Sequence, residues 1–598
     1  MPVLNPPHTG MGKTSFDPAS VVSSWLSTFS DALQVKDARA VSDCFLVEGW
    51  LRESQIFCWD NRTLHGREKI YQHVAEHLPK RLFSHFCVEA RAFLSPERGN
   101  VAPGHEGIKS GFTFETAVQW GQGYVQLLQD VDGTWKALAV HLAASDIKGQ
   151  EESGREVGIY GGHSLPWPAV LAARRKQAEE SPHALIIGAG HVGVTIAARF
   201  KQMNIPTLVI DAQSRLGDFW RNRYESLILH TTRVHDNFLY QPYPKNWPLH
   251  TPKDKLANWI EHYVDTQDLT VWTSSRPAED TFPTYDDVTK RWTIVVDRAG
   301  QRVTLHPAHI VACIGILGPK IMPQIKNSSR FKGTVIHGGD FKMPEPYRNK
   351  RVVVVGAGNT AGDICIDLST CAESITLVQR SKSTLIPAEI LRNGLNHVWP
   401  DDGSIPLETS DFLSASTPYN LFRSYSKVTK AGGGGESGKY AAFYRGLREK
   451  GMVVDDGDGG EGTAFQVLEK YGGFMLDVGC VKLILSGRVG VKHGVEIAEM
   501  REESVIFTDG SEIPADAVIF ATGYRPVREN QVRIFGEETI QRAGPMWGLD
   551  DEGELNGVYR PTGHPALWYG AGGFQVVRYG SKQLAMLVKA RDLRLTET

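Results

Sequence analysis

Two glycine-rich segments constrain the fold of this 598-residue chain more than any other feature of its sequence. The first reads Ala184-Leu-Ile-Ile-Gly-Ala-Gly-His-Val-Gly193, and the second reads Val352-Val-Val-Val-Gly-Ala-Gly-Asn-Thr-Ala361. Each begins with an apolar run that predicts a buried strand and continues through a glycine turn into a predicted helix. In this arrangement the N-terminus of the helix binds a pyrophosphate. We therefore expect an α/β chain with two dinucleotide-binding units.

The first segment has the spacing of a site for a dinucleotide without a 2′-phosphate. Gly188 allows the tight turn, Gly190 lets the backbone approach the pyrophosphate, and Gly193 lets helix and strand pack closely. Asp211 ends the next apolar run, 23 residues after Gly188. An acid at this distance is expected to accept a hydrogen bond from a ribose hydroxyl.

The second segment ends differently, with a base in place of the acid. Gly356 and Gly358 hold the first two glycine positions, Ala361 holds the third, and Arg380 follows the next apolar run, just before Ser381. An arginine can fork onto phosphate oxygens, a charge-assisted bond worth about 1.5–3 kcal/mol. We therefore expect a 2′-phosphate here; the alternative is a solvated arginine without a ligand.

Composition excludes several other classes of protein. A net charge of −3 and a pI of about 6.7 give no basic surface for nucleic acid. The seven cysteines have no CxxC spacing, so neither a metal site nor a disulfide framework is expected. The N-terminus lacks the order of a signal peptide, and no apolar run approaches the ~18 residues of a membrane span. We expect a cytoplasmic protein.

The N-terminal segment has a different texture. It predicts helices over Val21–Leu33 and Gly66–Leu78, and strands over Gly123–Gln129 and Trp135–His141 that flank the turn Asp130–Gly133. This order resembles the nuclear-transport-factor-like or SnoaL-like cone fold. That resemblance implies either a pocket for a small apolar ligand or a module for homodimerisation.

The pattern weakens in the middle of the chain. Gly432–Gly435 and Asp455–Glu461 are interpreted as flexible loops. The second resembles a calcium loop but has Val467 at the twelfth position, where a bidentate glutamate is required. Substrate specificity is expected to lie in loops over residues 385–475.

Four further motifs carry a family resemblance. The stretch Phe331-Lys-Gly-Thr-Val-Ile-His-Gly-Gly-Asp-Phe341 matches the identifying sequence of flavin-containing monooxygenases, which are class B flavoprotein monooxygenases. The segments Leu216–Trp220, Asp516–Tyr524 and Gly570–Phe574 are similar to other motifs of that family, in the same order. Within the family, Tyr224–His230 and Gly473–Gly479 are closest to the YUCCA-like branch.

The resemblance implies FAD and NADPH as cofactors, and O₂ and a small organic molecule as substrates. One oxygen atom would pass from a C4a-(hydro)peroxyflavin to the substrate, by N- or S-oxygenation or by YUCCA-like oxidative decarboxylation. Together with the glycine segments, it predicts FAD contacts at Gly188, Gly190, Gly193, Asp211, Trp220, Thr522 and Gly523. It predicts NADPH contacts at Gly356, Gly358, Asn359, Arg380 and Ser381, a coupling role for His337 beside the cofactors, and His230 as the catalytic candidate.

The predicted organisation places an NADPH-binding domain inside an FAD-binding domain. The order along the chain is a flexible tail (1–15), a SnoaL-like α+β domain (16–150), a linker (151–182), the N-terminal half of the FAD-binding domain (183–345), the NADPH-binding domain (346–514) and the C-terminal half of the FAD-binding domain (515–598).

Two alternative functions share most of these motifs. A Baeyer–Villiger monooxygenase acting on a ketone would end the family signature with Trp, whereas this chain has Phe341. A flavin-dependent NADPH oxidase or disulfide reductase would not oxygenate a substrate. The reductase is disfavoured because no CxxC or CxxxxC pair follows the first glycine segment. A binding protein without catalysis would need a damaged nucleotide site, and neither segment shows damage.

Overall fold

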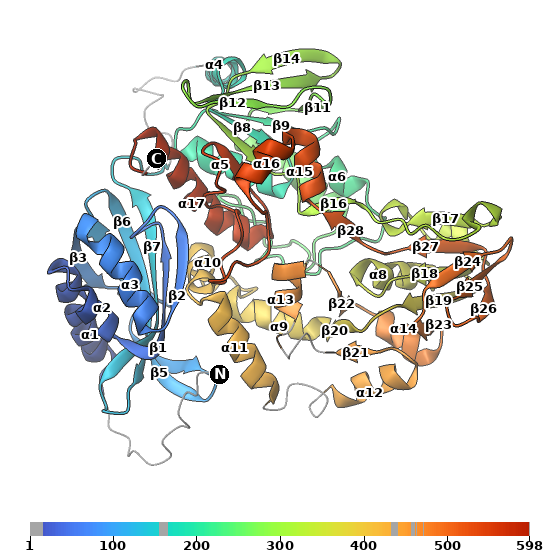
Figure 1. Cartoon of the computed structure of the whole chain (residues 1–598), viewed down its shortest axis with the longest axis horizontal. Helices are drawn as coiled ribbons and strands as arrows, with labels where there is room; N and C mark the ends of the chain where they lie inside the picture. The colour runs from blue at the N-terminus through green and yellow to red at the C-terminus, as the bar shows by residue number, and fades with distance from the viewer. Residues whose placement is uncertain are drawn as a thin grey trace.

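The computed structural model describes residues 16–154, 166–431, 440–455, 461, 463–470 and 472–596. In Figure 1 the N-terminal region (blue) stands at the left, and two α/β regions lie at the top and at the right. Each α/β region is built around a five-stranded sheet whose neighbouring strands run parallel. The expected α/β class with two dinucleotide-type units is confirmed.

The first unit contains the first glycine segment. Its sheet has the order β10-β9-β8-β15-β29, and every residue of β8 and β15 is buried. Such continuous apolar strands are expected where helices cover both faces of a parallel sheet. The elements are β8 (Ala184–Ile187), α5 (His191–Gln202), β9 (Thr207–Ile210), α7 (Lys253–Thr266), β10 (Val271–Trp272), β15 (His309–Ala312), β29 (Leu567–Tyr569) and α17 (Phe574–Asp592).

A small antiparallel meander extends the first unit. Here β13 pairs with three short strands and lies above the main sheet in Figure 1. Its strands are β11 (Ser275–Pro277), β12 (Thr284–Asp286), β13 (Arg291–Arg298) and β14 (Gln301–Leu305).

The second unit contains the second glycine segment, in a sheet of order β17-β27-β18-β19-β23. The elements are β17 (Thr334–His337), β18 (Arg351–Val355), α8 (Asn359–Leu368), β19 (Ser374–Gln379), α14 (Cys480–Ser486), β23 (Val489–His493) and β27 (Ala517–Phe520).

Sheet membership differs from the predicted boundaries at residues 345 and 515. Both β17 and β27 pair inside the second sheet, although the predicted ranges assign them to the two halves of the FAD-binding domain. The chain crosses between the units at β16 (Leu317–Lys320) and returns at β28 (Tyr524–Pro526). β16 and β28 pair antiparallel. Since β16 precedes β17 and β28 follows β27, the chain crosses between the units outside both of these strands.

Helices occupy much of the region that was expected to be loops. They are α9 (Ala388–Val398), α10 (Leu407–Ala415), α11 (Tyr419–Ala431) and α12 (Ala441–Glu449). The pattern of α10 is weak because its inward face buries Ser410 and Asp411 together with Phe412. Residues 1–15, 432–439, 456–460 and 462 lie outside the described residues, and with them the predicted tail and most of the two predicted flexible loops.

The N-terminal region forms a seven-stranded sheet of order β2-β1-β7-β6-β5-β3, with β4 beside β5. Its helices confirm the two predicted ones and add a short third, and β6 and β7 include the two predicted strands. The elements are α1 (Pro18–Gln34), α2 (Ala38–Asp43), β1 (Phe45–Ser54), β2 (Asn61–His65), α3 (Arg67–His77), β3 (Phe83–Val88), β4 (Glu97–Ala102), β5 (His105–Thr116), β6 (Gln119–Gln129) and β7 (Trp135–Ile147).

The two faces of this sheet contact different regions of the chain. Along β7, Val140 and Leu142 pack with the helices of the N-terminal region, whereas His141 stacks on Phe412 of α10, with ring centroids 5.5 Å apart. Alternate residues of a strand point to opposite faces, which explains the division. The second face is therefore buried against helices α10 and α11, as Figure 1 shows (yellow).

Candidate functional site: two dinucleotide sites and their junction

A cavity of about 460 Å³ opens at the carboxyl ends of the strands in the first sheet. In open α/β sheets this edge is where ligands bind. The lining includes the loops that follow β8, β9, β15 and β29. Among the lining residues are Gly188, Gly190, His191, Asp211, Trp220, Cys313, Gly315 and Gly570–Gly572.

The three glycines of the first segment are required for different reasons. Gly188 has φ +108°, and a Cβ there would lie 2.4 Å from the carbonyl oxygen of Cys313. A Cβ on Gly193 would lie 1.9 Å from the carbonyl oxygen of Gly188, so helix and turn touch. A Cβ on Gly190 would meet nothing within 4 Å. The protein itself leaves the space at Gly190 open, which fits a pyrophosphate at the N-terminus of α5.

Asp211 lies at the edge of the same cavity, after β9. Its Oδ2 accepts a hydrogen bond from the backbone N–H of Ala189 (2.7 Å), and its Oδ1 accepts one from Gln213 (2.8 Å). Each carboxylate oxygen has a second lone pair, so the group can still accept from ribose hydroxyls. Trp220, on the short helix α6 (Asp218–Arg221), lines the cavity as well.

The second segment repeats the turn of the first. Gly356 has φ +121°, and a Cβ there would lie 2.4 Å from the carbonyl oxygen of Ala521. Gly358 precedes α8 as its N-cap residue, and Ala361 is fully buried. Asn359 Oδ1 accepts a hydrogen bond from the N–H of Leu476 (2.7 Å), which ties the first turn of α8 to β22 (Phe474–Asp477).

Arg380 follows β19, at the place that corresponds to Asp211. Its side chain is 75% exposed, and Nη1 lies 3.1 Å from Oε1 of Glu496. Ser381 beside it is exposed. A phosphate bound here would meet a cation whose partner in the described part of the chain is one exposed carboxylate, an interaction of at most about 1 kcal/mol.

Hydrogen bonds around the family signature hold the segments at which the chain leaves and enters the second unit. His337 Nδ1 accepts from the N–H of Gly339 (3.0 Å), so Nε2 carries the proton and donates to the carbonyl of Gly523 (3.0 Å). Burial lowers the pKa of His337, which favours this neutral form. Thr522 donates its hydroxyl proton to the carbonyl of Ile321 (2.6 Å), so this hydroxyl is bonded to the backbone.

His230 lies between the units. Its Nε2 is 3.7 Å from Oδ1 of Asp363 on α8, and the hydroxyl of Tyr224 donates to Oδ2 of the same carboxylate. Burial raises the pKa of Asp363, while the charge of His230 acts in the opposite direction. The segment 224–230 is thus fixed to α8, the helix of the second glycine segment.

Two residues to which the sequence assigns no role, His191 and Asp411, hold the C-terminal segment in place. His191 Nε2 hydrogen-bonds to the carbonyl of Gly572 (3.0 Å), and its ring stacks on Phe574 at 4.5 Å. The buried guanidinium of Arg578 forms a bidentate pair with Asp411 on α10, with both N–O distances 2.7 Å. Only contact between distant segments identifies Asp411, because nothing in its local sequence distinguishes it from a surface aspartate.

The chain is similar in sequence to known flavin-binding enzymes. The flavin-binding monooxygenase-like family matches residues 212–425. The Arabidopsis thaliana protein named "Probable indole-3-pyruvate monooxygenase YUCCA7" is 27% identical over 378 residues, which cover 59% of this chain and 78% of that protein. Indole-3-pyruvate monooxygenase YUCCA1 of Oryza sativa subsp. japonica is 25% identical, covering 67% and 88%.

A solved structure is similar in fold. A cyclohexanone monooxygenase variant from Rhodococcus sp. Phi1, bound to NADP+, matches with a TM-score of 0.50 and 15% sequence identity, covering 70% of this chain and 86% of that one. At this identity the likeness concerns the fold alone.

The sequence matches make the chain similar to flavin-binding monooxygenases, and they support flavin-dependent monooxygenation, an oxidoreductase activity with FAD and NADPH as cofactors. It is similar to the YUCCA enzymes of plants over most of their length. Among the described residues, no helix is long and apolar enough to cross a bilayer.

Proposed function

We propose that this monooxygenase oxygenates a small 2-oxo acid, which then loses its carboxyl group as CO₂. The observation that carries the proposal is that the two sequence relatives above are both named for indole-3-pyruvate, a 2-oxo acid. Phe341 agrees with it, since the Baeyer–Villiger branch would have Trp at this position. Phe341 is buried and stacks on Tyr347, with ring centroids 5.7 Å apart.

The reaction consumes one 2-oxo acid, one O₂, one NADPH and one proton. It yields the carboxylic acid shorter by one carbon, CO₂, water and NADP+. One oxygen atom of O₂ enters the acid and the other enters water. FAD, when bound, supplies the activation of O₂, and NADPH supplies the hydride.

The residues that would hold FAD lie around the cavity of the first unit. The N–H groups at the start of α5 would bind the pyrophosphate where Gly190 leaves space, and Asp211 would accept from the ribose. Trp220 would pack against the cofactor. The open space at Gly190 and the two unused acceptor positions of Asp211 are the features that fit the group.

The residues that would hold NADPH lie around the second glycine segment. The N-terminus of α8, with Gly358 and Asn359, would bind the pyrophosphate. Arg380 would leave Glu496 and fork onto the 2′-phosphate, with Ser381 beside it.

His230 is proposed as a positioning residue that holds the two cofactor sites in register. Its contact with Asp363 fixes a segment next to the first site to the helix at the second site. His337 would hold the turn at Thr522 and Gly523, where the chain leaves the second sheet.

We also propose that residues 16–150 adopt a SnoaL-like cone fold. A strongly paired sheet with α1, α2 and α3 on one face supports this proposal. Its other face packs against the same chain, where Arg52 forms a buried ion pair with Glu554 (2.8 Å). We therefore favour a role in the monomer over homodimerisation through that face.

The test uses the holoenzyme with NADPH, ¹⁸O₂ and either indole-3-pyruvate or phenylpyruvate. Catalase must be present, because free H₂O₂ decarboxylates 2-oxo acids without an enzyme. We expect an acid one carbon shorter with one ¹⁸O, formed at the rate of NADPH oxidation. Lactone formation from cyclohexanone without turnover of 2-oxo acids would show a Baeyer–Villiger enzyme instead. NADPH oxidation without any oxygenated product, together with H₂O₂ formation in a parallel assay that lacks catalase, would show an oxidase.

A further inference from the structure

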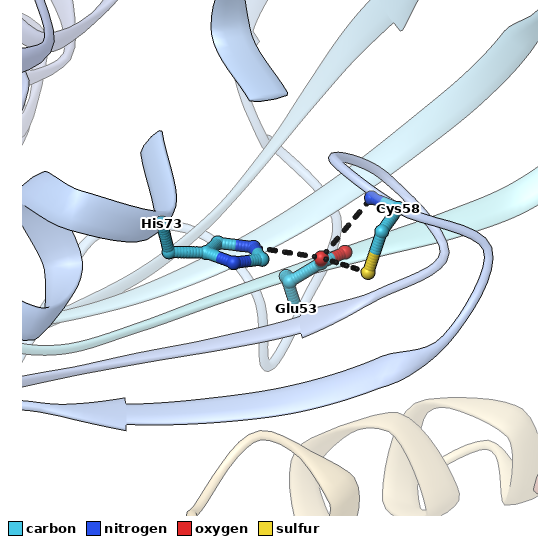
Figure 2. Close-up of side chains that lie close together, drawn as sticks. All are labelled: Glu53, Cys58 and His73. Carbon is cyan, nitrogen blue, oxygen red and sulfur yellow. Dashed lines mark hydrogen bonds and ion pairs between the residues drawn. The ribbon is translucent and has the colours of Figure 1, made fainter. Parts of the chain in front are cut away.

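Three side chains with metal-binding atoms converge inside the N-terminal region (Figure 2). Glu53 lies on β1, Cys58 lies in the loop after β1, and His73 lies on α3. Glu53 Oε1 is 3.1 Å from Cys58 Sγ and 3.1 Å from His73 Nε2. One ligand atom of each residue lies within 4.8 Å of the other two.

The carboxylate of Glu53 is fully buried and held in one orientation. Oε2 accepts hydrogen bonds from the N–H groups of Ile56 (2.8 Å) and Phe57 (3.2 Å), and Oε1 accepts from that of Cys58 (3.2 Å). Among the ion pairs of the described residues, its only partner is His73. Burying a carboxylate costs several kcal/mol, and no arginine or lysine of the described chain pairs with it to offset that cost.

We propose that Glu53, Cys58 and His73 bind a divalent metal ion of the zinc class, with water as the fourth ligand. One thiolate, one imidazole and one carboxylate form a donor set typical of zinc, while magnesium and calcium prefer oxygen alone. Cys58 is partly exposed, and this gives the ion and its water a path from solvent.

The two distances to Glu53 Oε1 require only a small adjustment. Zinc bond lengths of about 2.0–2.3 Å in a tetrahedron place two ligand atoms about 3.3–3.6 Å apart. The two measured distances to Glu53 Oε1 would therefore lengthen by a few tenths of an ångström. The ion would replace the protons that Cys58 Sγ and His73 Nε2 now direct at Oε1. The three backbone N–H bonds that hold Glu53 could all remain.

Ligation would release a proton from Cys58, because the thiolate and not the thiol is the metal ligand.

A second cluster with metal-binding atoms does not suit a metal ion, because its histidine nitrogen is committed to another hydrogen bond. His183, His309 and Asp592 also bring three ligand atoms together. However, Trp568 Nε1–H donates to His309 Nδ1 (3.1 Å), so Nε2 of the neutral ring carries the proton. A metal at Nε2 would require a proton on Nδ1, directed at the N–H of Trp568. For His73, no described hydrogen bond places a donor on Nδ1.

The proposed ion would stiffen the loop after β1, through which the N-terminal region contacts the rest of the chain. This loop continues to Asp60, which pairs with Arg560 at two distances, 2.8 and 2.9 Å. Metal binding would thus fix one side of the contact between the two regions. Sequence spacing could not reveal the site, since strand, loop and helix supply the ligands at positions 53, 58 and 73.

The test adds Co²⁺ as a spectroscopic probe to the full-length holoenzyme after chelation and dialysis. We expect one Co²⁺ per chain and a thiolate-to-cobalt charge-transfer band in the difference spectrum against the same sample without cobalt. Cys58→Ser should lose the band and raise the Kd for Zn²⁺ at least 100-fold, beyond the ~10–100-fold that loss of an outer-shell partner costs. Cys87→Ser, at an exposed cysteine of the same region, is the matched control and should keep both.

Cobalt uptake without the thiolate band would overturn the proposal, as would equal Zn²⁺ affinity in the two variants. If Cys58→Ser does not fold, alkylation of the wild-type protein decides. Zn²⁺ should slow alkylation of Cys58 at least about tenfold and leave Cys87 unchanged. Equal rates with and without Zn²⁺ would contradict the site.

Discussion

The two dinucleotide units share one turn and differ in the residue that follows the second strand. Gly188 lies against the carbonyl of Cys313 and Gly356 against that of Ala521, with the same 2.4 Å limit on a Cβ. Asp211 is held by two backbone N–H groups beside a cavity, whereas Arg380 is exposed and, among the described residues, pairs with Glu496. In the proposed assignment, the turn binds a dinucleotide in each unit, and the residue at the strand end selects which dinucleotide it is.

The contrast also concerns rigidity. A ribose is neutral, and an acceptor that selects it must already be oriented, because a single neutral hydrogen bond contributes only about 0.5–1.5 kcal/mol. A phosphate attracts its partner over a longer range, so an exposed arginine can move to reach it. This difference leads to four predictions, in order of decreasing effect.

Gly193→Ala should abolish FAD retention, and Gly190→Ala should weaken it with little effect on the fold. A Cβ at 193 overlaps the carbonyl of Gly188, which should destabilise the apoprotein by about 1–3 kcal/mol. A Cβ at 190 touches no protein atom, so the apoprotein should stay within about 1 kcal/mol of wild type while FAD Kd rises at least tenfold. Thermal unfolding of apoprotein and FAD titration measure the two effects. Equal losses of apoprotein stability would contradict the assignment of that space to a ligand.

Acid should destabilise the first unit before the second. His564 is 4% exposed and stacks on Trp292, and burial together with the charge of Arg542 lowers its pKa to about 4. The unfolded chain binds this proton near pH 6.5. The contribution of neutral His564 is therefore complete above pH 6.5 and is lost as pH falls toward 4. A difference of about 2.5 units corresponds to at most about 3 kcal/mol.

In the second unit, the ion pair with Arg351 lowers the pKa of Asp516 to about 2. Its contribution is present above pH ~4 and is lost only as pH falls toward 2. As the pH is lowered from 7 to 5, hydrogen exchange should therefore show the first sheet losing protection at a higher pH than the second sheet. His564→Gln should flatten the pH dependence of stability in the first unit. Asp516→Asn should lower the stability of the second unit and leave its pH dependence between pH 7 and 5 unchanged. Simultaneous opening of both sheets would refute this difference.

Arg380→Ala should lower kcat/KM for NADPH about 10- to 100-fold, because a charge-assisted bond of about 1.5–3 kcal/mol is lost. The value for NADH, which lacks the phosphate, should stay within about twofold. Steady-state kinetics with both coenzymes gives the comparison. Arg501→Ala is the matched control, since Arg501 is also exposed and also paired with a glutamate of the second unit. Equal losses for the two coenzymes would show that Arg380 does not contact the 2′-phosphate.

Asp211→Asn should weaken FAD binding about tenfold. The amide keeps the size of the carboxylate but directs an NH₂ group at the N–H of either Ala189 or Gln213, so one hydrogen bond is lost. FAD titration of the apoprotein gives the Kd. An unchanged value would mean that the carboxylate orients only the backbone turn and not the cofactor.

Sequence alone predicted the two glycine turns, because strand, turn and helix are local patterns with fixed spacing. It also predicted α1, α3, β6 and β7, whose apolar periodicity is strong. It could not assign β17 and β27 to the second sheet, since pairing between strands about 180 residues apart leaves no local trace.

The middle of the chain shows a second limit. Asp411 pairs with Arg578 in the interior, so α10 buries a charged residue where a helical pattern would require an apolar one. Likewise, Glu53, Cys58 and His73 come together only because α3 packs against β1, and local sequence does not show this packing.

The most direct test of two different dinucleotides acting together is anaerobic stopped-flow reduction of the wild-type holoenzyme. NADPH and NADH are mixed in turn with enzyme that holds one FAD per chain, and the bleaching of the flavin is followed. NADPH should bleach the flavin completely, at least about tenfold faster than NADH at equal subsaturating concentrations. Equal rates with both coenzymes, or no bleaching by NADPH, would contradict the account.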